Sequence, residues 1–291
     1  MKHMNRRLLS AAGILVLVAL SLLACAAETV IYERHSGHGT IIVTESGEGL
    51  RTLLFERGGA RQSIVKPGDP EHVELQYARV ALVGLALCEG PRRILIVGLG
   101  GGTLPSFLHK HYPDATIDVA EIDPDVVDVA RKFFGFREDA RMRVHVDDGR
   151  RFVESILQPT YDAVFLDAFG ADNVPVHLTT QEFLHAVRRS LMPGGVVIGN
   201  VWARSSNRLY DSMVRTYQEA FDELFILDVS KDVNKILLAL PRKLSLSQSE
   251  LAQRARKVST EGHFRFDLGD LVEHGFMHAR EKRKDGRLLR D

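Results

Sequence analysis

One stretch of the chain restricts its possible folds more than any other. It consists of an apolar run over 94–97, which suits a buried parallel strand, and a glycine turn. The turn contains four glycines, Gly98, Gly100, Gly101 and Gly102. We expect a helix over 103–111 and a second strand over 116–120 after it. Glu121 and then Ile122 follow that strand, and this order predicts a nucleoside-binding crevice in which the carboxylate accepts hydrogen bonds from both ribose hydroxyls.

The spacing of the turn and a later acidic pair indicate which nucleoside would bind. The turn reads Gly-Leu-Gly-Gly-Gly, so the third glycine of the dinucleotide pattern G-x-G-x-x-G is displaced. A third strand over 142–146 precedes Asp147 and the pair Asp148-Gly149, where an acid could bind the exocyclic amine of adenine. No phosphate-binding lysine follows the turn, which favours adenosine with an uncharged or cationic tail, such as a sulfonium. In the alternative interpretation, Glu121 and Asp148 cap helices and bind no ligand.

A fourth strand over 161–166 brings Asp167 to the same edge of the sheet. Ligands of open α/β sheets bind in the crevice at this edge. A carboxylate beside a bound sulfonium could orient an incoming amine and accept its proton, without needing a raised pKa. The alternative is that Asp167 only caps a loop. The long loop that follows would cover the acceptor, and Asp172 and His177 are candidates to line it.

Three patterns divide the chain beyond its N-terminal segment. Residues 28–70 alternate between apolar and polar side chains with glycine-rich turns, which predicts a small antiparallel β-hairpin domain. Over 71–241, apolar strands alternate with helices, which predicts an α/β domain with a mostly parallel sheet of seven strands. These strands are expected near 94–97, 116–120, 142–146, 161–166, 195–201, 224–228 and 235–240. Residues 242–291 are expected to form a polar helical tail.

Two helix boundaries are also predicted. A helix is expected from about residue 71 to 87, after the break at a Pro-Gly-Asp-Pro segment. Thr179 and Glu182 have the spacing of a capping box, which predicts the start of a helix over 180–190.

The balance of charge excludes some classes of partner. The 291 residues include 38 basic and 38 acidic side chains, so no overall field attracts the chain to nucleic acid or to anionic lipid. The twelve histidines show no metal-ligand spacing and no cysteine cluster accompanies them, so no metal site is expected.

The N-terminal segment, 1–25, has the pattern of an export signal. Basic residues precede an apolar run over 8–23, which ends in Leu-Leu-Ala-Cys. This ending resembles the bacterial lipoprotein box, with Cys25 as the lipidated residue. The alternatives are an uncleaved signal anchor, because 8–27 is just long enough to cross a bilayer, and a misassigned start codon. We therefore expect a membrane-associated protein. The sequence does not indicate on which side of the membrane the protein lies.

The motifs together resemble the spermidine synthase (polyamine aminopropyltransferase) family over roughly residues 30–240. The resemblance includes the leading hairpin domain, which generic methyltransferases lack. Gln62 matches the glutamine of a Tyr-Gln-Asp-Ile-type segment. Tyr77 matches the tyrosine of the Asp-Glu-Phe-x-Tyr helix, with Glu74 as its preceding acid. The other matches are the glycine loop at Gly98, Gly100 and Gly102, the ribose acid Glu121, the adenine pair Asp148-Gly149 and the catalytic aspartate Asp167.

The resemblance implies a Rossmann-like class I methyltransferase fold and a transferase without a tightly bound cofactor. The donor co-substrate would be decarboxylated S-adenosylmethionine and the acceptor an amine such as putrescine. Asp167 and Tyr77 would be the catalytic residues, with Glu74 and Asp172 as further candidates to bind the amine. The products would be a longer polyamine and methylthioadenosine. Members of the family are commonly dimers or tetramers, so a homodimer is possible.

Two departures from the family pattern leave alternatives open. Gly101 stands where the family has the aspartate that holds the aminopropyl ammonium, and Gly170 stands in place of the second acid of the family's Asp-Ser-Ser-Asp-Pro segment, which grips the acceptor amine. A glycine at 101 would not repel the carboxylate of ordinary S-adenosylmethionine. The glycine turn also resembles lysine and N-terminal protein methyltransferases related to spermidine synthases, so the second hypothesis is methyl transfer to an amine or protein. The third is a non-catalytic lipoprotein that binds a nucleoside or polyamine.

Overall fold

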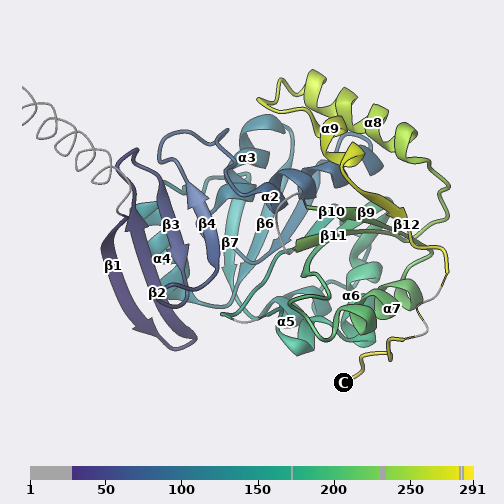
Figure 1. Cartoon of the computed structure of the whole chain (residues 1–291), viewed down its shortest axis with the longest axis horizontal. Helices are drawn as coiled ribbons and strands as arrows, with labels where there is room; N and C mark the ends of the chain where they lie inside the picture. Colours follow the sequence, from purple (N-terminus) through teal and green to yellow (C-terminus); the bar gives the residue numbers. More distant parts are fainter. Residues whose placement is uncertain (1–27, 172, 230–233, 282, 284) are drawn as a thin grey trace, which may run out of the picture.

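The computed structural model describes residues 28–171, 173–229, 234–281, 283 and 285–291, which form two β-sheets and their covering helices (Figure 1). The N-terminal sheet is an antiparallel meander in the order β1-β2-β3-β4. Its strands are β1 (Thr29–Ser36), β2 (Gly39–Glu45), β3 (Arg51–Leu54) and β4 (Arg61–Val65). Its apolar face packs through Val43 and Leu53 against Val126 and Val129 of α4 (Pro124–Phe133). The predicted hairpin sheet is confirmed.

The second sheet contains, among the described residues, eight strands in the order β12-β10-β11-β9-β8-β5-β6-β7. They are β5 (Arg93–Val97), β6 (Thr116–Glu121), β7 (Met142–Val146), β8 (Tyr161–Leu166), β9 (Leu191–Trp202), β10 (Glu223–Asp228), β11 (Asn234–Leu240) and β12 (Phe276–His278). Strands β5 to β9 are parallel, and β10, β11 and β12 join antiparallel. The seven predicted strands are confirmed. The tail adds β12 at the edge, and three residues are too few to show a strand period in sequence.

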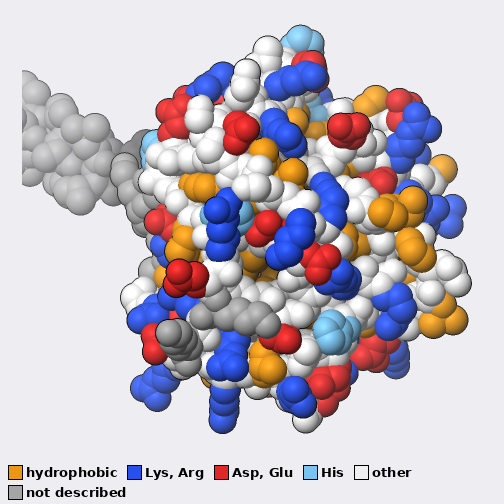
Figure 2. Space-filling model, turned by 90° about the vertical axis from the view of Figure 1, so that its right-hand side faces the viewer, with side chains coloured by type: hydrophobic (Ala, Val, Ile, Leu, Met, Phe, Trp, Pro, Cys, Tyr) orange, Lys and Arg blue, Asp and Glu red, His pale blue; other side chains and the backbone are white. Residues whose placement is uncertain are grey.

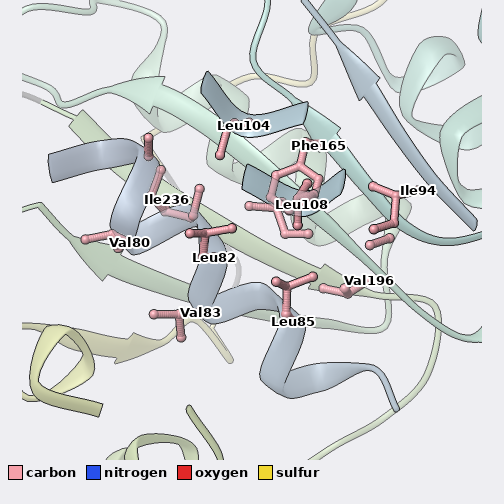
Figure 3. Close-up of a cluster of buried hydrophobic side chains, with 14 of the residues drawn as sticks. Val80, Leu82, Val83, Leu85, Ile94, Leu104, Leu108, Phe165, Val196 and Ile236 are labelled. Carbon is pink, nitrogen blue, oxygen red and sulfur yellow. The ribbon is translucent and has the colours of Figure 1, made fainter. Parts of the chain in front are cut away.

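Helices cover both faces of this sheet. One face carries α2 (Gln76–Ala81), the 3₁₀ helix η2 (Leu82–Leu87), α3 (Thr103–His111), α4, α8 (Gln248–Glu261) and α9 (Leu268–Glu273). The other carries α5 (Gly149–Glu154), α6 (Gln181–Ser190) and α7 (Tyr210–Ala220). Figure 3 shows Leu82 and Leu85 of η2 and Leu108 of α3 beside Phe165 and Val196 of the sheet. Because both faces are buried, the central strands are apolar on both sides.

Two local predictions need correction. The helix expected from residue 71 begins at Gln76, because the amides of Asp69 and His72 close successive turns and Leu75 is still extended. The N-cap of α6 is Thr180, whose hydroxyl accepts the amide of Phe183. Thr179 ends the short 3₁₀ helix η3 (Val176–Leu178) instead, and its hydroxyl donates to the Val176 carbonyl. The predicted capping box is therefore wrong, because the N-cap lies one residue later and Phe183 at the N3 position cannot complete a box.

The surface mixes both signs of charge. Figure 2 shows basic and acidic side chains interspersed over one face, in line with the equal numbers in the sequence. Within the described part of the chain, no helix has the length and apolarity needed to cross a bilayer. The predicted signal over 1–25 and its Cys25 lie outside the described residues.

Candidate active site

A cavity opens at the carboxyl ends of β5, β6 and β8, where the N-terminal sheet and α2 meet the parallel sheet. Most of the predicted site residues line it: Gln62, Tyr77, Gly98, Gly100, Glu121, Ile122, Asp148, Gly149 and Asp167. His177 of η3 lines it as well. The structure thus brings together residues that are up to 115 positions apart in the chain, because parallel strands end at one edge of the sheet.

Some predicted residues lie elsewhere. Glu74 is not among the residues that line the cavity, and its carboxylate lies 3.0 Å from Nε2 of His72. Gly101 and Gly102 belong to the same turn as Gly98 but do not line the cavity either. Asp172 lies outside the described residues.

The turn after β5 needs glycine for close packing. Gly98 has a φ of 101°, and a Cβ there would lie 2.5 Å from the carbonyl oxygen of Asp167. Gly102 has a φ of 80° as the N-cap of α3, and a Cβ there would lie 2.7 Å from the ring of Phe136. Only glycine tolerates both the left-handed backbone and these contacts. Gly98 therefore lets the turn approach the end of β8, where Asp167 begins the next loop.

Gly101 faces a packed neighbourhood. A Cβ at this position would lie 3.0 Å from the ring of Phe134 and 3.0 Å from Cβ of Ser63 in β4. An aspartate at Gly101 would therefore have to displace both neighbours. Ser63 itself lines the cavity, and its hydroxyl oxygen lies 3.4 Å from Oγ1 of Thr103. Two hydroxyl groups thus stand beside Gly101.

Glu121 is held by backbone amides at the end of β6. Its Oε2 accepts the amide of Leu99 at 2.9 Å and its Oε1 accepts the amide of Asp123 at 3.0 Å. Burial raises the pKa of this carboxyl group, against the lowering effect of the two amides. The helix-capping alternative is wrong for Glu121, because the N-cap of α4 is Asp123. Next to Glu121, Ile122 leaves 43% of its surface exposed at the cavity.

Asp148 both caps a helix and lines the cavity. It is the N-cap of α5, and its Oδ1 accepts the amides of Arg150 and Arg151 at 2.9 and 3.0 Å. Its Oδ2 lies 2.9 Å from Nε2 of His177. Burial would raise the pKa of Asp148, but the Arg151 amide and His177 outweigh it and hold the pKa below its ordinary value. Capping and ligand binding are therefore compatible here.

Asp167 has different surroundings at the end of β8. The amide group of Asn200 donates to its Oδ1 at 2.9 Å, and the hydroxyl of Tyr77 donates to its Oδ2 at 3.3 Å. Burial raises the pKa of Asp167 from its ordinary value of 3.8 to about 7, although Asn200 and Tyr77 each lower it. The carboxyl group is therefore poised to exchange a proton near neutral pH. The raised pKa was not required by the sequence-based mechanism and is a finding of the structure.

Two residues behind Asp167 were not predicted from the sequence, Asn200 in β9 and Asn234 in β11. Both are buried, and Nδ2 of Asn234 donates to Oδ1 of Asn200 at 2.7 Å. A polar residue inside an otherwise apolar strand is the signal that could have pointed to Asn200, because buried amides need partners. Among the described residues, no three His, Cys, Asp or Glu side chains cluster in a way that could hold a metal ion.

Comparisons with known proteins show which proteins this chain is similar to. The family model for the spermine/spermidine synthase domain matches residues 76–234. The polyamine aminopropyltransferase of Vibrio vulnificus is 33% identical over 252 residues, which cover 84% of this chain and 83% of that protein. The human eEF1A lysine and N-terminal methyltransferase is 33% identical over 232 residues, 70% of this chain, although this match spans only 33% of the methyltransferase. The structure of a probable spermidine synthase from Corynebacterium glutamicum has the same fold, with a TM-score of 0.71 at 20% identity, over 90% of this chain and 97% of that one.

Proposed function

Since this chain belongs to the spermine/spermidine synthase domain family, we propose that it transfers an aminopropyl group from decarboxylated S-adenosylmethionine to a polyamine-like amine. The observation that carries this proposal is the environment of Asp167. Its carboxyl group lies in the cavity beside Tyr77, with a pKa of about 7 that results from burial. A base with a pKa near the working pH is the most effective at accepting a proton from an amine.

In this proposal the donor lies along the edge formed by β5, β6 and β7. Adenine packs on the exposed side chain of Ile122, and its exocyclic amine donates to Asp148. The ribose hydroxyls donate to Glu121. Both oxygens of Glu121 already accept a backbone amide, but a carboxylate has about four acceptor sites, so two remain for the ribose.

The reaction then needs few groups from the protein. The amine nitrogen attacks the aminopropyl carbon bonded to sulfur, a carbon–nitrogen bond forms and the carbon–sulfur bond breaks. The electron pair of the broken bond goes to sulfur, which leaves as the neutral thioether methylthioadenosine. The amine gives up one proton to Asp167, and Oδ2, the oxygen on the side of Tyr77, is the acceptor. Holding the amine and the sulfonium in line supplies a further large share of the rate.

A second candidate is methyl transfer from S-adenosylmethionine to an amine or a protein. Gly101 favours it, because a glycine supplies no acid to hold an aminopropyl ammonium, and a Cβ at this position would lie 3.0 Å from both Ser63 and Phe134. The similarity to the human methyltransferase supports the same candidate. A chain that binds either donor but turns over neither would fit the third hypothesis, a non-catalytic nucleoside- or polyamine-binding protein.

Calorimetric titration of the full chain with each donor tests these candidates. We expect the decarboxylated donor to bind more tightly than S-adenosylmethionine, and Glu121→Ala to weaken both. A preference for S-adenosylmethionine would favour methyl transfer. Unchanged binding by Glu121→Ala would contradict the proposed ribose site.

We also propose that residues 1–25 attach the protein to a membrane, either through a lipid on Cys25 or as an uncleaved anchor. Mass spectrometry of the protein purified from membranes tests this, with Cys25→Ser as the control. A lipidated N-terminus at Cys25 would support the first form, an intact N-terminus in the membrane fraction would support the second, and recovery only in the aqueous fraction would contradict both. Light scattering tests the possible homodimer.

A further inference from the structure

Behind Asp167, two buried amide side chains continue the hydrogen bonding away from the cavity. Asn200 lies in β9 and is 5% exposed, and Asn234 is the first residue of β11 and is 8% exposed. The two strands are antiparallel neighbours, with Asn200 opposite Ile236 and Asn234 opposite Trp202. Asn234 donates to Asn200 at 2.7 Å, and Asn200 donates to Asp167 at 2.9 Å. Two strands of the sheet therefore support one catalytic carboxylate.

The direction of these hydrogen bonds follows from the chemistry of the groups. An ionised carboxylate accepts hydrogen bonds and cannot donate, so Asn200 must turn its amide nitrogen toward Asp167. The amide oxygen of Asn200 then faces Asn234, which must present its own amide nitrogen. A reversed Asn200 would set its oxygen against the carboxylate, and that arrangement suits only a protonated Asp167. Asn234 thus selects the orientation of Asn200 that fits the ionised form.

We propose that Asn234 and Asn200 are positioning residues that keep Oδ1 of Asp167 occupied as an acceptor and leave Oδ2 to take the proton of the amine. This inference rests on the proposed role of Asp167 as the base. The hydroxyl of Tyr77 lies 3.3 Å from Oδ2, a longer contact than the 2.9 Å from Asn200 to Oδ1, so Oδ2 is the less engaged of the two oxygens. Neither asparagine touches the reacting atoms, and both act through Asp167.

The other ionisable groups of the cavity do not share this task. Glu121 of β6 is engaged by the amides of Leu99 and Asp123. Asp148 is engaged by backbone amides and by His177. Around Asp167 itself, burial raises the pKa, and the hydrogen bonds from Asn200 and from Tyr77 of α2 lower it. The donor from Asn200 thus limits the rise in the pKa of this buried carboxyl group.

A carboxyl titration of the unliganded full chain tests the proposal without needing turnover. Nuclear magnetic resonance of the protein labelled with ¹³C at the aspartate carboxyl carbons gives the pH midpoint at which Asp167 titrates. The Asp167→Asn variant assigns the signal. Asn234→Leu removes the donor to Asn200 without adding charge, and we expect the midpoint of Asp167 to rise by about half a pH unit or more. Asn234→Asp reverses the amide of Asn200 and also adds a negative charge, so a rise of more than about one unit is expected.

The control separates positioning from general destabilisation. Ser190→Ala removes a buried side-chain hydrogen bond to the Val187 carbonyl at the end of α6, and because Ser190 precedes β9 at the end of the strand opposite to Asn200, the midpoint should stay unchanged. A midpoint that stays at the wild-type value in both Asn234 variants would overturn the proposal. If turnover is present, the acid limb of the pH–rate profile should move with the midpoint. An absent turnover with a shifted midpoint would count against the proposed function only.

A measurement on the wild-type protein covers the case in which the variants do not fold. The side-chain ¹⁵N amide signals of Asn200 and Asn234 should shift with pH at the same midpoint as the carboxyl signal of Asp167. Asp167→Asn should abolish both shifts. Amide signals that do not respond to the titration of Asp167 would contradict the proposed chain of contacts.

Discussion

Asp148 and Asp167 follow two parallel strands of one sheet, β7 and β8, and line one cavity, yet their carboxyl groups have opposite surroundings. Asp148 accepts two backbone amides at the N-terminus of α5 and contacts His177, and its pKa is lowered. Asp167 is buried, has only the neutral donors of Asn200 and Tyr77, and has a pKa of about 7. The backbone amides at the start of α5 therefore favour the ionised form of Asp148. The two neutral side chains beside Asp167 do not offset the effect of its burial.

This difference assigns separate tasks to the two acids. A carboxylate that stays ionised over the working pH range suits the binding of a nucleoside amine. A carboxyl group that titrates near neutral pH suits proton transfer. The same contrast implies a difference in stability, because the ionised form of Asp167 is disfavoured in the folded protein and that of Asp148 is favoured.

The largest expected effect is on turnover, through Asp167→Asn. The amide has the shape of the carboxyl group but cannot accept the proton, so kcat should fall by about 10²- to 10⁴-fold. The Kd of the adenosyl donor should stay within about threefold of the wild-type value, because Asp148 and Glu121 are untouched. Steady-state kinetics and calorimetry measure the two quantities. Full activity of the variant would contradict the assignment of Asp167 as the base.

The same variant should also change the pH dependence of stability. The folded protein holds the proton of Asp167 up to about pH 7, while the unfolded chain releases it near 3.8, so wild-type stability falls as the pH rises between these values. Asp167→Asn removes this loss. Urea unfolding should show that the stability of the variant relative to wild type is about 4 kcal/mol greater at pH 8 than near pH 4. A constant difference across this range would contradict the raised pKa.

A smaller effect is expected from Asp148→Ala. The variant loses the proposed contact with adenine, so the Kd of the donor should rise by about tenfold, while kcat at saturation changes little. The lost N-cap of α5 should lower the free energy of unfolding by about 1 kcal/mol. Calorimetry at a temperature well below the unfolding transition separates the two effects. A large fall in kcat would contradict the assignment of donor binding to Asp148 and of proton transfer to Asp167 alone.

The smallest effect is expected from His177→Ala. The variant removes one partner of Asp148 but keeps the backbone amides of Arg150 and Arg151. The Kd of the donor should therefore rise by about threefold or less. A rise as large as that of Asp148→Ala would mean that His177, rather than the helix start, holds the carboxylate ready for the donor.

The parallel-sheet part of the molecule could be predicted because its signals are local. Glycines, apolar runs and an acid at a strand end follow one another within about 30 residues, as the nucleoside-binding pattern requires. Position at a strand's carboxyl end then predicted that Glu121 and Asp167 share an edge, and both line the cavity.

Other features of the site could not be predicted, for physical reasons. Asn200 and Asn234 meet only because β9 and β11 pair in one particular register. Glu74 precedes a helix that begins later than expected, and it pairs with His72 instead of lining the cavity. The pKa of Asp167 depends on how completely the cavity walls enclose it, and no sequence pattern reports that enclosure.

Identification of the nucleoside product tests the central claim most directly. The full chain is incubated with equal concentrations of S-adenosylmethionine, its decarboxylated form and putrescine, and the products are separated by mass spectrometry. We expect methylthioadenosine together with an aminopropylated amine, and loss of both in Asp167→Asn. S-adenosylhomocysteine with a methylated amine, and no methylthioadenosine, would contradict aminopropyl transfer and establish the methyltransferase alternative.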